Sequence, residues 1–292
     1  MNVKAIIYKI SLLGFLAVLL ACNSSVDRSS KFKILSYNVL TGFQQDSIIQ
    51  DQYVTWVKKI NPDIIAYQEM DYFTQKKIEA FAARYQHNYA VISKEHGCPT
   101  ALSSQYPIVN VQKVVDNMWH AYIYANINGI HVFVIHFSPA QLVKKRAEVK
   151  EVLAHAALIP KNEKIVILGD FNSLSEDDAE SYGDEYLELR KRSEAQNPNI
   201  RNLDNGKLDF SVIRAMKDAG FVDAYRMFHQ DFKASMPTKK YIREGVINTP
   251  RRIDFVWLNP ELAKYAVSAD YLHDDYTNTM SDHYPLLVEF EF

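Results

Sequence analysis

The sequence alternates short apolar runs typical of β-strands with longer segments of helical periodicity, and this order most constrains the fold. Strand-like runs at 33–39 and 63–67 flank a segment, 47–60, whose apolar residues recur at helical spacing. Later in the chain a helical pattern over 139–158 precedes an apolar run at 164–168. Further helices are expected at 73–85, 182–195 and 209–219, and further strands at 253–258 and 286–292. Helix–strand units therefore occupy both ends of the chain.

The middle of the chain contains closely spaced strand-like runs instead. They lie at 89–93, 100–104, 109–115, 120–127 and 130–137, and the Asn128-Gly129 pair between the last two favours a hairpin turn. Helix–strand units on either side of such a meander indicate two packed sheets with helices outside, in preference to one doubly wound sheet. We therefore predict an α/β (α+β) fold in a single domain, residues 32–292.

The first 31 residues have the pattern of an export signal and a tether. Lys4 and Lys9 precede a twelve-residue, largely apolar run at 10–21, which is shorter than the ~18 residues needed to span a bilayer. This run ends directly before Cys22, as in a bacterial lipobox, where the cysteine becomes lipidated and starts the mature chain. An ordinary signal peptide with an incidental cysteine is the alternative. We expect 1–21 to be a signal peptide, 22–31 a tether, and the protein to be exported and lipid-anchored in the bacterial cell envelope.

Charge and cysteine content exclude some classes of protein. The formal net charge is −2, with 33 basic and 35 acidic residues, which argues against a protein that grips duplex nucleic acid mainly by counterion release. Two cysteines cannot form a disulfide framework. Eight basic residues fit either a phosphate-facing rim or ordinary surface solvation: Lys144, Lys145, Arg146, Lys239, Lys240, Arg243, Arg251 and Arg252.

Polar side chains stand where the apolar strands end, and these positions carry the functional prediction. A structural role explains each one alone, because Asx turns, helix caps and satisfied core histidines are common. Asp254 is the exception, since a carboxylate inside an apolar strand needs a partner to offset its desolvation. Together they form a set that structure alone does not explain: Asn38, Glu69, His136, Asp170, Asn172, Asp254, Asp282 and His283.

The residue types in this set indicate a particular chemistry. Oxygen ligands without cysteine or paired histidine spacing favour Mg²⁺ or Mn²⁺ over structural zinc. Histidines beside carboxylates suit proton transfer near neutral pH. A divalent ion, acid–base histidines and amide donors are what phosphodiester hydrolysis requires.

Six short motifs in this order resemble the endonuclease/exonuclease/phosphatase family of metal-dependent phosphohydrolases. The resemblance extends from about residue 33 to residue 292 and implies a four-layer α/β/β/α sandwich of two mixed sheets with helices on the outer faces. The motifs are Ser36-Tyr37-Asn38-Val39, the run 63–69 ending in Gln68-Glu69, Ile135-His136-Phe137, the run 168–173 containing Gly169-Asp170-Phe171-Asn172, Arg252-Ile253-Asp254 and Ser281-Asp282-His283-Tyr284-Pro285.

The resemblance also implies a metal site. It makes Glu69 the principal ligand of Mg²⁺ or Mn²⁺, with Asn38 beside it and Asp282 as a second contributor. Asn38 is also expected to contact the substrate.

The same resemblance implies roles for the catalytic residues. Asp170 orients or deprotonates the attacking water, and Asn172 holds that water or the phosphate. His283 contacts the scissile phosphate or acts as base, oriented by Asp254. His136 donates to a phosphate oxygen or the leaving group. The choice of general base between Asp170 and His283 stays open.

The substrate is less constrained by the sequence. The family spans nucleases, deadenylases, inositol-phosphate phosphatases and sphingomyelinases, and His136 stands where abasic-site endonucleases usually have tyrosine. We expect a phosphodiesterase whose partner is a phosphate ester (nucleic acid, a phospholipid head group or a small phosphorylated metabolite), with the membrane contacted through the N-terminal lipid and no obligate protein partner. Alternatives are a phosphomonoesterase of inositol or sugar phosphates, a catalytically silent binding protein, and a sugar hydrolase using Glu69 and Asp170.

Overall fold

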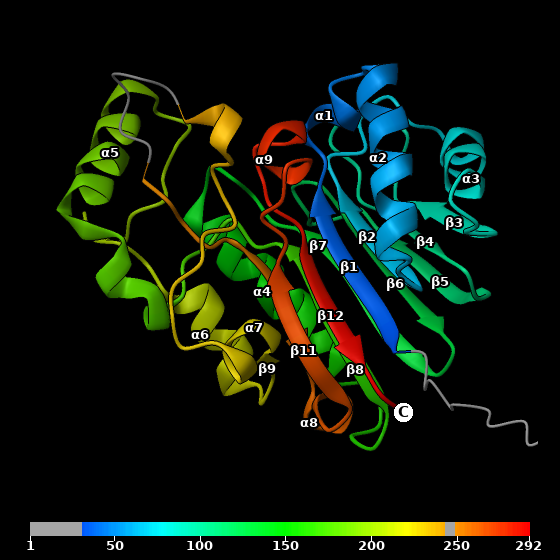
Figure 1. Cartoon of the computed structure of the whole chain (residues 1–292). Coiled ribbons are helices and arrows are strands. Elements are labelled where there is room, and N and C mark those ends of the chain that lie inside the picture. Colours follow the sequence, from blue (N-terminus) through cyan, green and yellow to red (C-terminus); the bar gives the residue numbers. More distant parts are fainter. Residues whose placement is uncertain (1–30, 243–248) are drawn as a thin grey trace, which may run out of the picture. The chain divides into compact units, whose positions relative to one another are not determined.

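Two six-stranded mixed sheets form the centre of the computed structural model, which describes residues 31–242 and 249–292 (Figure 1). The first sheet has the order β11 (Ala266–Tyr271), β12 (Leu286–Phe290), β1 (Phe32–Asn38), β2 (Ile64–Gln68), β4 (Ala101–Ser104), β3 (Tyr89–Ile92). The second has the order β5 (Ile108–Val114), β6 (Tyr122–Ile127), β7 (Ile130–His136), β8 (Lys164–Asp170), β10 (Asp254–Leu258), β9 (Val222–Asp223). Parallel pairs join β1 to β2 and β7 to β8, and the other pairs are antiparallel.

The central strands are buried on both faces, which explains their continuous apolar sequences. In β1, Ile34 packs into the core between the two sheets, whereas Leu35 faces the helices outside. In β8, Val166 packs between the sheets and Ile167 faces outward in the same way. Alternate residues of one apolar strand thus pack into two hydrophobic cores. The polar residues of the strand lie at its end, at the edge of the sheet.

Helices cover the outer face of each sheet (Figure 1). The turn-like α1 (Leu40–Phe43), α2 (Ser47–Ile60) and α3 (Gln75–Ala83) pack on the first sheet, and α4 (Leu142–Ala156) and α6 (Ser211–Asp218) on the second. The remaining helices are η1 (Glu176–Ser181), α5 (Gly183–Gln196), α7 (Ala224–Phe228), η2 (Lys239–Tyr241), α8 (Pro260–Ala263) and α9 (Thr277–Met280). The α/β sandwich of two packed mixed sheets with helices around them is confirmed.

Local sequence signals explain where the helices begin and end. The helix expected at 47–60 has these bounds, because the Asp46 side chain accepts from the Ile48 N–H and Asn61 adopts a left-handed conformation. The helix expected at 73–85 begins at Gln75, since Thr74 caps it. The helix expected at 139–158 begins at Leu142 after the Ser138 hydroxyl accepts from two loop N–H groups. The short elements β9, β11, α7, α8 and α9 were not predicted.

The N-terminal predictions lie outside this part of the structure. The signal peptide, Cys22 and all of the tether except Lys31 lie in residues 1–30, which are not described. Among the residues that are described, no helix combines the length and apolarity needed to cross a bilayer.

Gly169 allows β7 and β8 to approach closely at the edge where the polar residues lie. Its φ is +140°, and a Cβ atom there would lie 2.0 Å from the carbonyl oxygen of Ile135. Only glycine fits this position. The parallel register that results places His136 directly opposite Asp170.

Arg252 anchors the start of β10 through a buried ion pair network. The side chain is fully buried, and its Nε and Nη1 donate to Asp178 Oδ2 at 2.8 Å and Asp223 Oδ2 at 2.5 Å. The guanidinium also lies 4.6 Å from the ring centre of Phe255. The network therefore fixes the backbone that leads into Asp254.

We predict that Arg252→Met lowers the free energy of unfolding by about 3–5 kcal/mol, because it leaves the buried Asp223 carboxylate without its cation and leaves Asp178 with Arg226 alone. Urea denaturation measures this loss. Arg192→Met, at an exposed position on α5, is the matched control and should change stability by less than about 0.5 kcal/mol. Similar losses in both variants would contradict this account of Arg252.

Candidate active site

Strand register brings the polar strand-end residues to one edge of the two sheets. Asn38 ends β1 and pairs with Gln68 at the end of β2, so Glu69 follows beside it. His136 and Asp170 end β7 and β8, and Asp254 begins the antiparallel β10 opposite Asp170. Residues from both sheets meet here, since Asn38 Nδ2 lies 3.3 Å from Asp170 Oδ2.

Glu69 is held rigidly at this edge with both carboxylate oxygens directed by donors. Oε1 accepts from Asn38 Nδ2 at 3.1 Å and Oε2 from the Thr41 N–H at 3.0 Å. Glu69 has a left-handed backbone conformation with a φ of +60°, and Thr41 is also left-handed, with a φ of +49°. Asn38 Oδ1 accepts from the Leu40 N–H, so its amide turns the NH₂ group toward the carboxylates. In this arrangement Asn38 orients Glu69 instead of offering an oxygen to a cation.

His283 forms a buried charged pair with Asp254 next to Asp170. Its Nδ1 donates to Asp254 Oδ2 at 2.8 Å, and its Nε2 lies 3.9 Å from Asp170 Oδ2 and 4.0 Å from Asp282 Oδ1. Burial alone would lower the pKa of His283, but Asp254, Asp282 and Asp170 outweigh it and raise the pKa to about 10. The imidazole is therefore positively charged at neutral pH.

Asp170 lies at the centre of the cluster and is almost completely buried. Its Oδ1 accepts from the Asn172 N–H at 2.8 Å, and its Oδ2 lies 3.5 Å from His136 Nε2. Burial and the neighbouring Asp254 carboxylate raise the pKa of Asp170, and Glu69 adds to this shift. The site thus contains more negative charge than its own histidines offset.

His136 is a neutral, buried imidazole that stacks on a second histidine. The rings of His136 and His120 are 4.1 Å apart at an angle of 16°. Burial, with the positive charges of His283 and Lys94, lowers the pKa of His136 to about 3. Its Nδ1 is buried without a hydrogen-bond partner among the described residues, while its Nε2 is directed toward Asp170.

Asn172 is positioned by backbone contacts on both sides. It has a left-handed φ of +48°, and its side-chain Nδ2 donates to the Phe137 carbonyl oxygen at 3.1 Å. The buried Lys145 donates its Nζ to the Asn172 carbonyl oxygen at 2.7 Å. Lys145 thus supports the turn that follows Asp170.

A cavity of about 310 Å³ opens onto this cluster. Glu69, His136, Asp170, Asn172 and His283 line it, whereas Asn38 and Asp254 lie buried behind them. Asp282 is outside the lining and reaches the site through its contact with His283. The wall also includes Arg251, a candidate for the basic rim, and residues that were not predicted at the site: Cys98, His120, Pro139, Arg190, Met236 and Ile253.

The eight basic residues that the sequence offered as a phosphate-facing rim do not form one surface. Arg252 and Lys145 are buried in structural contacts, and Arg146 pairs with Asp204 and Asp209. Arg251 is the member that lines the cavity, and Arg243 lies outside the described residues. A run of basic residues in sequence thus does not form one phosphate-facing surface.

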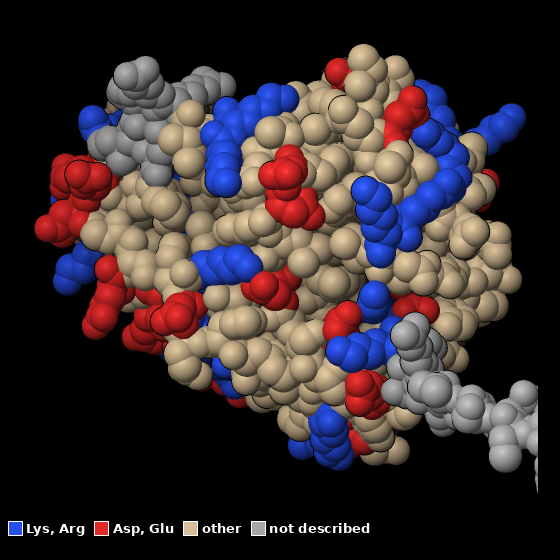
Figure 2. Space-filling view, in the orientation of Figure 1, with Lys and Arg blue, Asp and Glu red and all other residues tan. Residues whose placement is uncertain are grey.

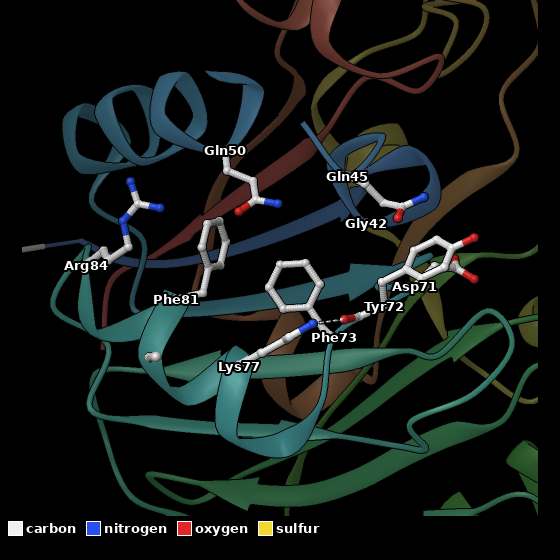
Figure 3. A pocket seen from close by; sticks show the side chains of 10 residues that line it. Gly42, Gln45, Gln50, Asp71, Tyr72, Phe73, Lys77, Phe81 and Arg84 are labelled. Carbon is white, nitrogen blue, oxygen red and sulfur yellow. Dashed lines mark hydrogen bonds between the residues drawn. The ribbon is translucent and has the colours of Figure 1, made fainter. Parts of the chain in front are cut away.

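A second hollow lies beside Asp71 and Tyr72, which follow Glu69 in the sequence (Figure 3). It has a volume of about 410 Å³ and is lined by α1, α2 and α3 together with the loop of Asp71 and Tyr72. Lys77 donates to the Tyr72 carbonyl oxygen across it at 3.0 Å. Its only acidic lining residue is Asp71, so the residues expected for phosphate chemistry are not gathered here.

Two places at the site offer ligands for a divalent cation: a cluster of three residues and the single carboxylate of Glu69. Asp170, Asp254 and His283 bring ligand atoms within 4.8 Å of one another, but the His283–Asp254 hydrogen bond already uses one atom of each. Glu69 lines the cavity and has no basic side chain within 4.0 Å among the described residues. A preorganised carboxylate, next to a cluster with excess negative charge, fits Mg²⁺ or Mn²⁺. The fit is better at Glu69 than between Asp254 and His283.

An α/β sandwich with carboxylates, histidines and amides gathered at one strand edge has the arrangement of a phosphate-ester hydrolase. Residues 35–283 match the Endonuclease/Exonuclease/phosphatase family, and the chain belongs to this family. The resemblance seen in the sequence motifs is confirmed. Enzymes of this family are typically dependent on a divalent metal ion.

Solved structures share the fold at low sequence identity. An AP endonuclease from Archaeoglobus fulgidus has a TM-score of 0.67 and 21% identity, over 89% of this chain and 100% of its own. A 3′ phosphatase from Neisseria bound to a product DNA hairpin has a TM-score of 0.67 and 20% identity, with the same coverage. A 3′-5′ exonuclease from Neisseria meningitidis has 0.65 and 20%, again over 89% and 100%. No curated protein sequence matches the chain.

We predict that Asp254→Asn removes the charge that keeps His283 protonated above neutral pH. A histidine with a raised pKa stabilises the fold fully below its unfolded value near 6.5, and this contribution is lost as the pH rises through about 10. Between pH 6.5 and 10 the wild type should therefore lose at least about 1.4 kcal/mol more stability than Asp254→Asn, the equivalent of one pKa unit.

Urea unfolding in the presence of EDTA at both pH values measures this difference. Asp116→Asn, at an exposed position, should keep the pH dependence of the wild type. Equal pH dependence in the wild type and Asp254→Asn would contradict the charged pair.

Proposed function

We propose that this protein is an exported, lipid-anchored phosphodiesterase that depends on Mg²⁺ or Mn²⁺. The observation that best supports the metal-dependent activity is the Glu69 carboxylate. Asn38 and Thr41 orient it at the cavity that Asp170 and His283 also line. A bound divalent ion at Glu69 would supply positive charge to the phosphoryl oxygens.

The protonation states favour one of the two candidates for general base. His283 is already protonated at neutral pH, because Asp254 holds its charged form. It therefore serves as a cationic donor to the scissile phosphate. Asp170 is left to accept the proton of the attacking water. Burial and Asp254 raise its pKa to about 8, so it acts as base only in its ionised form.

The other predicted residues position the substrate. His136 is neutral and lines the cavity, where a ring N–H would donate to a phosphate oxygen or to the leaving group. Asn172, next to Asp170, holds the attacking water or the phosphate, and Asn38 orients both carboxylates. A chain that had become a silent binding protein would not need this complete set, and the phosphomonoesterase remains the alternative to test.

The substrate is proposed to be a small phosphate ester or the end of a larger one. The cavity of about 310 Å³ is at the small end of the range for ligand pockets. The formal net charge of −2 does not favour binding along a polyanion, and basic and acidic side chains are interspersed on the face shown in Figure 2. A phospholipid head group or a nucleotide end is consistent with both observations.

We predict that the wild type hydrolyses bis(p-nitrophenyl) phosphate with Mg²⁺ or Mn²⁺, and that EDTA abolishes the reaction. Glu69→Gln should lower kcat/KM by roughly 100-fold or more, because the neutral amide holds a cation far less well. Release of p-nitrophenol measures the rate. Glu163→Gln is the matched control, since Glu163 precedes β8 at the end opposite Asp170.

Two outcomes would contradict the proposal. Full activity of Glu69→Gln would exclude Glu69 as the metal ligand, and a wild-type rate that EDTA leaves unchanged would exclude metal dependence. Hydrolysis of p-nitrophenyl phosphate but not of the diester would identify the phosphomonoesterase alternative.

The lipid anchor has a separate test. We predict that the full chain expressed in a bacterial host partitions into the detergent phase of Triton X-114, and that Cys22→Ser moves it to the aqueous phase. Mass spectrometry of the mature N-terminus provides the second measurement. An unmodified N-terminus at a residue other than Cys22 would show an ordinary signal peptide instead.

A further inference from the structure

Two arginines line the cavity beside the catalytic cluster without an acidic partner of their own. Arg190 comes from α5, and Arg251 from the loop before β10. Neither has a carboxylate oxygen within 4.0 Å among the described residues. Arg226 and Arg252, by contrast, are each paired with buried aspartates in the same part of the fold.

Tyr186 contacts both arginines. Arg190 donates its Nε and Nη2 to the Tyr186 hydroxyl at 2.8 Å and 2.6 Å, and its guanidinium lies 5.1 Å from the ring centre. The Arg251 guanidinium lies 6.0 Å from the centre of the same ring. The aromatic ring is fully buried, so it fixes both cations at the cavity wall.

The environment of Arg251 leaves hydrogen-bonding capacity unused. Its Nη1 donates weakly to the Thr249 carbonyl oxygen at 3.3 Å, while its Nε is buried without a partner in the described structure. Burial lowers the pKa of Arg251, and the positive charge of Arg190 adds to this effect, while Tyr186, Asp282 and Asp170 oppose it. Two neighbouring cations in a desolvated wall repel each other, and a bound anion would relieve that repulsion.

We propose that Arg190 and Arg251 form a second phosphate subsite, so that the substrate is a small ester carrying a second phosphate group beyond the scissile one. This inference rests on the proposed function, since it assumes that the scissile phosphate lies at Glu69, His136 and His283. The planar guanidinium groups match phosphate oxygens, and a phosphomonoester dianion balances two cations.

A pair of substrates with the same leaving group tests this subsite. Thymidine 5′-(p-nitrophenyl phosphate) has only the scissile phosphate, whereas its 3′-phosphorylated form adds a second. The wild type should show a kcat/KM at least roughly tenfold higher for the 3′-phosphorylated ester, as expected for charge-assisted hydrogen bonds. Arg190→Gln and Arg251→Lys should each remove most of this preference through KM, while the rate on the ester without the 3′-phosphate stays near that of the wild type.

Arg192→Gln is the matched control, because Arg192 is exposed on the same helix and does not line the cavity. Its preference should equal that of the wild type. Circular dichroism verifies that each variant is folded. An unchanged preference in both cavity variants, or no preference in the wild type, would overturn the subsite.

Calorimetric binding of thymidine 3′,5′-bisphosphate and thymidine 5′-phosphate separates this inference from the proposed function. Tighter binding of the bisphosphate, lost in Arg190→Gln, would support the subsite even if the wild type cleaved neither ester, in which case the proposed activity would fail alone. Equal binding of both nucleotides would overturn the subsite and leave the phosphodiesterase proposal untouched.

Discussion

The buried carboxylate of Asp170 is the constraint on which the rest of the site depends. Close pairing of β7 with β8, made possible by Gly169, places it where strands of both sheets end. A carboxylate in such a position is costly unless donors and charges surround it. The Asn172 N–H, the Asn38 amide and the His283 cation provide them, and the remaining negative charge fits the divalent ion that we propose for the site.

The same constraint connects stability to chemistry. Asp254 keeps His283 charged, and Arg252 anchors the strand that begins at Asp254 with two other buried aspartates. Fixing charged side chains in the interior in this way preorganises them for a charged substrate, so little rearrangement is needed when a phosphate binds.

Much of the fold could be predicted from the sequence, because apolar strands buried on both faces and capped helices such as 47–60 depend on local signals. The gathering of strand-end residues such as Asn38, His136 and Asp170 also followed, since strand ends meet at a sheet edge. Arg190 could not be found in this way. Its helix is polar, and its place at the cavity depends on how a long connection packs after β8. The basic run 251–252 shows the same limit, because one arginine faces the cavity and the next is buried in an ion pair network.

The position of a bound Mn²⁺ tests the central claim most directly. Crystals soaked with Mn²⁺ should give one anomalous peak at about 2.1–2.2 Å from a Glu69 carboxylate oxygen, with the hydrogen bond between His283 and Asp254 intact. A peak between Asp254 and His283, or no peak near Glu69, would contradict the account.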